Sequence, residues 1–363
     1  MRGIKALKKI AFEKKGYDGF LVTNEANVLY FTGFSVRALS PCILVSRTGE
    51  PTAYVYSVNY EQVKDEGKEF NVELVKKGEN LGAKIADKAR SLKMKKLGLD
   101  MVAGVPYVAD YRQLVEVLKG IAKVEVEDKL VRQLRSIKDQ GEIKLMREAG
   151  RLTSLGMKAA YETIKPGVRE YEVAAQIEYE MRSNGSWGTA FETIVASGVK
   201  SAFPHGGCSD RKIKRGDLVI VDIGATCQFY CSDMTRTFIA GNPSEKQKRI
   251  CKVVKRAQEK ALQAIRPKAE AKDVDATARK TIKDTGYGEY FVHGLGHGVG
   301  LEVHELPTLS SQSKDKLEIG NVVTVEPGIY MIDFGGVRFE DTVLVGKSKI
   351  EKLTNQLYDY NIG

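Results

Sequence analysis

The chain has 363 residues, of which 42% are hydrophobic and 29% are charged, and its formal net charge is +10. This length favours two domains with one core each, and no apolar run approaches the length that a membrane span needs, so we exclude membrane insertion. The basic residues alternate with acidic ones and form no known nucleic-acid-binding motif, so we expect no nucleic-acid partner.

Residues 1–125 alternate between helical and strand-like patterns. A basic amphipathic helix without a signal-peptide cleavage site comes first, and short β-rich runs such as YDGFLVTN, CILVSRTG and PTAYVYS follow. We therefore predict a compact α/β domain over residues 1–125 and a linker over 126–135. The five cysteines include no CxxC pair, which is typical of a reducing compartment and predicts a cytoplasmic protein.

From residue 136 onward the pattern changes to long helices, and an internal repeat appears. The segments 164–185 and 265–286 align without a gap at an offset of 101 residues, and in each a proline stops one helix and a glycine ends the next. β-rich sequence follows each copy. We therefore predict a second α/β domain over residues 136–363, with two halves folded on one plan about a pseudo-twofold axis and a site where they meet.

The run DLVIVDIGATCQFYCSDMTRTFIAG follows the first copy of the repeat. Its first part is typical of a buried strand that ends in Asp222, and Asp233 lies on the expected return strand. The midpoint of the two aspartates falls between Cys227 and Gln228. A reversal there predicts a hairpin with the aspartates side by side, their Cβ atoms about 5 Å apart. Two like charges that close together need a cation.

The run VVTVEPGIYMIDFGGVRFEDTVLV repeats this arrangement in the second half, with Glu326 and Glu340 centred on Asp333. One buried acid alone is often the structural partner of a basic side chain, but four acids in matched hairpins favour a metal site. Four carboxylates, with or without an imidazole, can bridge two divalent ions and favour Mn, Co or Fe over a structural zinc ion. Paired metal ions activate water, so this pattern indicates hydrolytic chemistry.

The segment HGLGHGVGLEVHE, residues 293–305, holds three of the four histidines of the chain. A phosphate-binding loop would need a following helix in a βαβ unit, but this segment enters an extended run stopped by proline. The HExxH pattern of helical zinc peptidases is also absent from the sequence. Glycines on both sides of His297 leave room around its imidazole, which suits a metal ligand, and His205 lies in the loop FPHGG.

These residues resemble the M24 metallopeptidases of pita-bread fold, and within them the branch of Xaa-Pro dipeptidases (prolidases) and Xaa-Pro aminopeptidases. The resemblance covers nearly the whole chain. It rests on NVLYFTGF near the N-terminus and on SAFPHGG, DLVIVDIGATCQFYCSDMTRTF, HGLGHGVGLEVHELP, VTVEPGIY and GVRFEDTVLV, in family order and spacing. It implies a small creatinase-like α/β domain at the N-terminus and a pita-bread catalytic domain with the pseudo-twofold repeat.

The resemblance also implies five ligands for two divalent ions, with Mn or Co expected first and Fe or Zn as alternatives. These ligands are Asp222, Asp233, His297, Glu326 and Glu340. In the family pattern, Asp233 and Glu340 bridge the two ions, and Glu326 takes the proton of the bridging water.

Other residues of this sequence match family positions around the metal ions. His293 and His304 correspond to histidines that contact the substrate and stabilise the tetrahedral intermediate, and Arg338 to an arginine of the hydrogen-bond network. His205 corresponds to a histidine lining the pocket of the scissile residue. We expect Phe191 and His205 to help form a small pocket for the proline ring, with plain core packing as the alternative for Phe191.

The resemblance implies a metallopeptidase that hydrolyses the Xaa-Pro bond of dipeptides. Xaa-Pro aminopeptidase activity on longer peptides is the alternative. A non-catalytic pita-bread binding module is the distant alternative, because the complete ligand set argues against it and against a metal-independent creatine hydrolase. The N-terminal domain is expected to help form a homodimer and to narrow the mouth of the site. There, Arg37 is a candidate to bind a dipeptide's terminal carboxylate across the dimer, with a solvated surface arginine as the alternative.

Overall fold

A computed structural model describes residues 3–33, 42–67, 70–100, 108–354 and 361–362, with the side chains of residues 108–111 and 361–362 left out. The chain forms two compact units, Met1–Arg135 and Ser136–Gly363, and each is considered by itself. Among the described residues, no helix has the length and apolar character that crossing a membrane requires.

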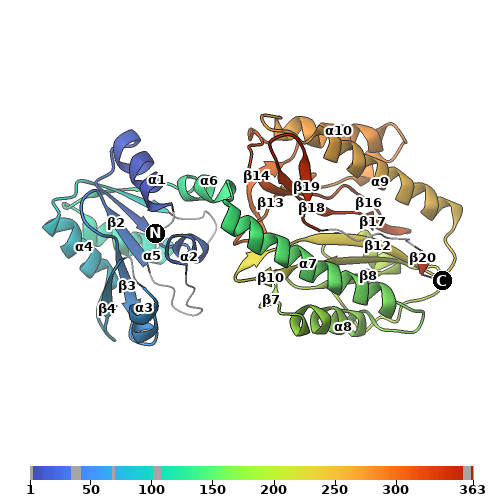
Figure 1. Ribbon diagram of the computed structural model, residues 1–363, viewed down its shortest axis with the longest axis horizontal. Coiled ribbons are helices and arrows are strands. Elements are labelled where there is room, and N and C mark those ends of the chain that lie inside the picture. The colour runs from blue at the N-terminus through green and yellow to red at the C-terminus, as the bar shows by residue number, and fades with distance from the viewer. Residues whose placement is uncertain (1–2, 34–41, 68–69, 101–107, 355–360, 363) are drawn as a thin grey trace. The chain divides into compact units, whose positions relative to one another are not determined.

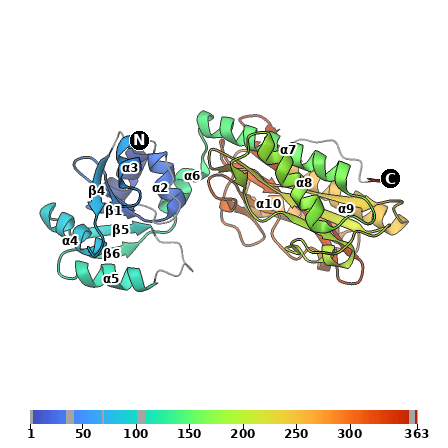
Figure 2. The ribbon, with the colours of Figure 1, turned by 90° about the horizontal axis from the view of Figure 1, so that it is seen from below.

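The first unit is built on a six-stranded sheet in the order β4-β3-β2-β1-β5-β6. Its strands are β1 (Gly19–Val22), β2 (Cys42–Ser46), β3 (Thr52–Tyr56), β4 (Asn71–Val75), β5 (Lys96–Asp100) and β6 (Lys123–Val126). Its helices are α1 (Ile4–Lys8), the π-helical turn η1 (Lys9–Lys14), α2 (Glu25–Thr32), α3 (Tyr60–Glu66), α4 (Leu81–Ser91), α5 (Val108–Leu118) and α6 (Leu130–Ser136). Figure 2 shows α4 and α5 on one side of this sheet and α2 and α3 on the other.

Residues 126–135, for which the sequence predicts a linker, hold the end of β6 and most of α6. Arg135 of α6 is buried, and its Nη1 donates to Oδ1 of Asn27 at 2.7 Å. The Nδ2 group of Asn27 in turn donates to Asp100 at 2.7 Å. This buried network anchors α6 in the core of the first unit. The sequence does not reveal the anchor, because the three polar residues lie far apart in the chain.

The second unit places two helix pairs on either side of its strands (Figure 1). The helices are α7 (Gln140–Thr163), α8 (Glu170–Ser183), α9 (Glu245–Ala264) and α10 (Ala271–Lys283), with the 3₁₀ turns η2 (Gly198–Ala202) and η3 (Gly288–Tyr290). The strands of the first half are β7 (Gly188–Thr189), β8 (Ile194–Ser197), β9 (Leu218–Ile223), β10 (Ala225–Cys227), β11 (Tyr230–Cys231) and β12 (Met234–Ala240). Those of the second half are β13 (Gly296–Gly298), β14 (Glu305–Leu309), β15 (Val322–Val325), β16 (Gly328–Met331), β17 (Gly335–Arg338), β18 (Asp341–Val345) and β19 (Ile350–Lys352), and β20 (Asn361–Ile362) pairs with β12.

The predicted repeat is confirmed by these boundaries. Helices α7 and α9 end at Thr163 and Ala264, and helices α8 and α10 begin at Glu170 and Ala271, so both pairs keep the offset found in the sequence. One core packs α7 and α8 against β9 and β12, and another packs α9 and α10 against β15 and β18. The strands of the two halves therefore face each other between the helix pairs, and the five candidate metal ligands lie on these strands or directly next to their ends.

Local sequence signals explain where the long helices begin. The side chain of Asp139 accepts from the N–H groups of Gly141 and Glu142, while the Glu142 carboxylate accepts from the N–H of Asp139 at 2.9 Å. This reciprocal capping box satisfies N–H groups that the first helical turn leaves unpaired. Ser244 and Gln247 form the same motif at the start of α9.

Candidate metal centre

In the first hairpin, Asp222 lies on β9 and Asp233 directly precedes β12, and the two aspartates are not directly opposite each other. β9 and β12 pair with Asp222 opposite Thr235, so Asp233 is diagonal to Asp222. The hairpin closes at Gln228 and Phe229, whose φ angles of 44° and 73° suit the type I′ turn of a two-residue hairpin loop. The predicted reversal, between Cys227 and Gln228, is therefore wrong by one residue. The prediction used the midpoint of the two aspartates, because the turn residues include no Asn-Gly pair that would mark the turn in the sequence.

The hairpin predicted for the second half is confirmed. The pairing of β15 with β18 and that of β16 with β17 follow one register, in which Glu326 stands opposite Glu340. Opposed residues on an antiparallel pair have neighbouring side chains on the same face of the sheet. The second half thus places two carboxylates opposite each other, where β15 continues into β16 and β17 continues into β18.

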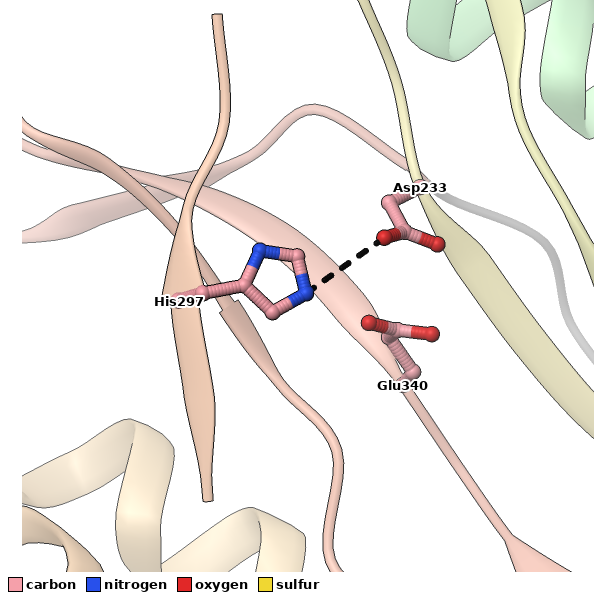
Figure 3. A group of neighbouring side chains, drawn as sticks. All are labelled: Asp233, His297 and Glu340. Atoms are coloured by element: carbon pink, nitrogen blue, oxygen red, sulfur yellow. Dashed lines mark ion pairs between the residues drawn. The ribbon is translucent and has the colours of Figure 1, made fainter. Parts of the chain in front are cut away.

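The imidazole of His297, on β13, lies among these carboxylates. Its Nε2 is 3.2 Å from Oε1 of Glu326 and 3.7 Å from Oδ2 of Asp233. His297, Asp233 and Glu340 each offer a ligand atom, and the three atoms lie within 4.8 Å of one another. Figure 3 shows these three side chains pointing toward a common centre.

The tautomer of His297 shows what this centre requires. Nδ1 lies 3.1 Å from the carbonyl oxygen of Gly298. Because a carbonyl only accepts, Nδ1 of the neutral ring carries the hydrogen, and the lone pair of Nε2 points at the carboxylate oxygens. Lone pairs and negative charges repel one another unless a proton or a metal cation lies between them. The hydrogen bond and negative charge of Glu326 raise the pKa of His297 despite its burial.

Three carboxylate oxygens at this centre are buried and have no hydrogen-bond partner among the described residues: Oδ1 of Asp222, Oδ1 of Asp233 and Oε1 of Glu340. Buried polar atoms in folded proteins are almost always paired, and a buried carboxylate without a partner is costly. Burial and the surrounding carboxylates raise the pKa values of Asp233 and Glu340 well above their usual range. The possible metal ligands here are four carboxylates and one imidazole, and this set fits hard divalent cations.

A buried arginine supports the outer side of this centre. Nη2 of Arg338 donates to Oδ2 of Asp222 at 2.7 Å, and Nη1 donates to the hydroxyl of Tyr330 at 2.8 Å. Nε of Arg338 donates to the hydroxyl of Thr235 at 3.0 Å. These bonds fix Oδ2 of Asp222, whereas its buried Oδ1 has no hydrogen-bond partner among the described residues.

Two threonines orient the carboxylates. Oγ1 of Thr235 donates to Oε2 of Glu340 at 2.6 Å, and Oγ1 of Thr324 donates to Oε1 of Glu326 at 3.2 Å. Outer partners of this kind fix the orientation of metal ligands. Sequence reasoning missed both threonines and Tyr330, because their roles depend on cross-strand pairing. Their only signal was their place within the acidic motifs.

The two other histidines of the Gly-rich segment differ in their bonding. In His293, Nδ1 lies 2.7 Å from the carbonyl of Gly294 and Nε2 lies 2.9 Å from the hydroxyl of Tyr330, so both ring nitrogens are engaged. His304 is exposed, and its ring centroid is 4.3 Å from that of His297. Burial lowers the pKa of His293, and partial desolvation and the neighbouring His297 lower that of His304, which favours the neutral form of both rings.

The remaining candidates lie at the edge of this cluster or outside it. His205 is exposed in the loop after η2, and the carbonyl of its neighbour Pro204 accepts from Arg338 at 3.3 Å. Phe191 is half-buried with its ring against Gly224, and the structure shows packing there rather than a bond to the cluster. Arg37 lies outside the described residues.

Both units of the chain match known protein families. Residues 144–347 match metallopeptidase family M24, and residues 4–137 match the creatinase/prolidase N-terminal domain. An Xaa-Pro dipeptidase of Pyrococcus horikoshii is 42% identical over 96% of each chain. The crystal structure of the prolidase from Pyrococcus horikoshii OT3 matches with a TM-score of 0.91 at 39% identity, over 99% of this chain and 100% of that one. An X-Pro aminopeptidase from Thermotoga maritima matches with a TM-score of 0.84 at 36% identity, over 95% and 97% of the chains.

Proposed function

The chain belongs to metallopeptidase family M24, and we propose that it hydrolyses the Xaa-Pro bond of dipeptides at a centre of two divalent metal ions. The observation that carries the metal centre is a set of three carboxylates, Asp222, Asp233 and Glu340, each with a buried oxygen that has no hydrogen-bond partner among the described residues. The substrate class is supported by the similarity to an Xaa-Pro dipeptidase along nearly the full length of both chains.

The residues that would hold the two ions are Asp222, Asp233, His297, Glu326 and Glu340. Mn and Co are the expected metals, because oxygen ligands dominate the set, and Fe and Zn are the alternatives. When bound, the ions supply polarisation of the scissile carbonyl and an activated water. The residues of the chain supply the orientation and the proton transfers around them.

Glu326 is the proposed proton acceptor. Its burial alone would raise its pKa, but interactions that include the hydrogen bond with His297 and the positive charge of Arg338 lower the pKa to about 2. The carboxylate is therefore ionised at neutral pH and able to take a proton from the attacking water. Its second role, as a ligand, keeps it next to that water.

His304 is the proposed donor to the substrate carbonyl. Its neutral ring has an N–H group, which stabilises the negative charge that develops on the carbonyl oxygen during attack. His293 is held by Gly294 and Tyr330, and Tyr330 is held by Arg338. In this arrangement the ring of His293 is held in place, and a substrate can bond its Nε2 atom only by replacing the hydroxyl of Tyr330.

The preference for proline follows from the geometry of the bond that is cleaved. Proline after the scissile bond leaves a tertiary amide without N–H and with a fixed ring. A site that grips the amine and carbonyl ends of the substrate does not need that N–H. We place the proline ring near His205 and Phe191, with plain packing as the alternative role of Phe191.

The experiment that tests the function uses protein stripped of metal and supplied with Mn²⁺ or Co²⁺. We expect metal-dependent hydrolysis of Leu-Pro and Met-Pro, with little hydrolysis of a tripeptide containing Xaa-Pro or of an N-terminal Met peptide. Hydrolysis of the tripeptide at a comparable rate would support the Xaa-Pro aminopeptidase alternative. The absence of metal-dependent hydrolysis of every substrate would refute the proposal.

We also propose a homodimer in a reducing, cytoplasmic compartment. The homodimer is supported by the resemblance of the N-terminal unit to the creatinase/prolidase N-terminal domain. The compartment is supported by five free thiols, of which Cys42, Cys231 and Cys251 are buried. Burial raises the pKa values of Cys42 and Cys251 to about 12, so these thiols stay protonated and unreactive.

A further inference from the structure

The turn between β13 and β14 carries His304, and its backbone folds around the carboxylate of Glu305. Oε1 of Glu305 accepts from the N–H of Glu302 at 3.1 Å, and Oε2 accepts from Nζ of Lys138 at 3.0 Å. Gly300 faces this carboxylate so closely that a Cβ atom there would lie 2.6 Å from Oε2. The carboxylate thus fills the inside of the turn and determines its shape.

The Lys138–Glu305 ion pair is almost fully buried, with side-chain exposures of 1% and 4%. Removal of water strengthens the attraction between the two charges, and it also makes either charge costly without the other. Lys138 is fixed independently, because its backbone N–H donates to the carbonyl of Gly320 at 2.9 Å, just before β15. The turn is therefore tied through Glu305 to a fixed point of the second unit.

His304 itself has no comparable anchor. Its imidazole is exposed and, within the described part of the chain, makes no hydrogen bond that would hold it over the metal ligands. Its position therefore depends on the backbone of the turn. His297 is held separately, because its backbone N–H donates to Oγ1 of Thr324 at 3.1 Å. A change in the turn should consequently displace His304 more than the metal ligand.

We propose that Lys138 and Glu305 are positioning residues that hold His304 over the candidate metal centre. The inference rests on the proposed function, in which His304 contacts the substrate carbonyl. The ion pair acts through the backbone of the turn, and its catalytic effect passes through His304. Misplacement of a substrate-contacting group by about 1 Å can lower a rate by about 100-fold.

A double-mutant cycle tests whether the effect passes through His304. Glu305→Gln keeps the size of the side chain and the hydrogen bond from Glu302, but it removes the charge that pairs with Lys138. We expect it to lower kcat for Leu-Pro by about 10- to 100-fold, with a smaller change in KM. In the His304→Ala background the same substitution should change kcat by less than about 2-fold. Equal losses in both backgrounds, or a His304→Ala variant with wild-type kcat, would overturn the proposal.

A second measurement does not depend on activity. The chain has four histidines, so their ring NMR signals can be assigned by single substitutions. In metal-free Glu305→Gln protein, we expect the His304 signals to shift or broaden while those of His205 stay unchanged. Unchanged His304 signals would overturn the inference. Failure of the proposed function would instead appear in the wild-type protein, as absence of metal-dependent Leu-Pro hydrolysis.

Two further variants separate positioning from loss of folding. The double variant Lys138→Met/Glu305→Gln removes both buried charges together, so it should fold and still show the displaced His304 signals and the reduced kcat. Wild-type kcat in this variant would contradict the proposal. Glu351→Gln is the control, because it removes an ion pair with Arg147 in the same unit, and its kcat should equal that of the wild type.

Discussion

The protonation of Asp233 and Glu340 couples the stability of the metal-free protein to pH. Burial and neighbouring carboxylates raise the pKa values of both acids in the folded state. An acid with a raised pKa binds more protons folded than unfolded. Its contribution to stability is therefore fully present below its unfolded pKa, near 4, and is lost as pH rises toward the folded pKa.

We accordingly predict that Glu340→Gln stabilises the metal-free protein relative to wild type, and increasingly so above pH 4. The difference in unfolding free energy should grow by at most about 1.4 kcal/mol per pH unit. Urea unfolding of both proteins at several pH values measures it. Glu351→Gln should show the opposite trend, because the hydrogen bond from Arg147 lowers the pKa of Glu351. A Glu340→Gln difference that is constant with pH would contradict the prediction.

Thr235 connects the two sides of the candidate centre, because it donates to Glu340 and accepts from Arg338. Thr235→Val removes both bonds at nearly constant volume. We predict a loss of about 10- to 100-fold in Mn²⁺ affinity or activity, measured by calorimetric titration and by Leu-Pro assay. Thr277→Val is the matched control, because that hydroxyl donates to the backbone carbonyl of Asp273 in its own helix. Equal Mn²⁺ affinity in the Thr235→Val and control variants would refute the role of Thr235.

Residues with unusual chemistry could be predicted from the sequence, and those that support them could not. The acids and His297 stood out because charged groups and an imidazole occur in runs that are otherwise apolar. Thr235, Thr324 and Tyr330 are ordinary strand residues in composition. Their importance comes from which atoms face them across the sheet, and this depends on a register that spacing alone does not determine.

At the scale of elements, the register predicted from the spacing of the acids is correct for the second hairpin and wrong by one residue for the first. The second hairpin turns beside a Gly-Gly pair, which marks the reversal in the sequence. The first turns at Gln228 and Phe229, both with positive φ, where no glycine or asparagine marks the turn. The ring of Trp187 packs edge-to-face on that of Phe229, with the two ring centroids 5.0 Å apart, and this contact helps to keep Phe229 in the turn.

The turn residue Gln228 provides a direct test of this register. Asparagine tolerates positive φ and β-branched residues do not. We predict that Gln228→Asn leaves stability unchanged or slightly raised, while Gln228→Val lowers the unfolding free energy by about 1–2 kcal/mol. Chemical denaturation of the two variants gives the comparison. Equal stability of the two would argue against a turn centred on residues 228 and 229.

The repeat of helix pairs was the most predictable feature of the second unit. Prolines at matched positions follow the ends of α7 and α9, at Thr163 and Ala264, and α8 and α10 begin at Glu170 and Ala271, so both pairs of boundaries are 101 residues apart. The helix α6 was less predictable, because its membership of the first unit depends on the buried bond between Arg135 and Asn27. Such a long-range polar contact leaves no periodic pattern in the sequence.

At the scale of the whole molecule, the described candidate residues all lie in the second unit, so the proposed role of the first is in assembly and in access to the site. We predict that the protein sediments as a homodimer, at twice the 40.2 kDa of one chain. We also expect Arg37→Ala to raise KM for Leu-Pro if this residue binds the terminal carboxylate across the dimer. A monomer in analytical ultracentrifugation would contradict the first expectation, and an unchanged KM the second.

The most direct test of the two-metal centre is a titration of metal-stripped protein with Mn²⁺, followed by Leu-Pro hydrolysis and by metal content. The two-metal centre predicts activity that rises with added ion and reaches its plateau at two ions per chain. The Asp233→Asn variant should lose this response, because its oxygen lies among the proposed ligands. Full Leu-Pro hydrolysis without metal, or no hydrolysis at any Mn²⁺ concentration, would contradict the proposal of a dinuclear hydrolytic centre.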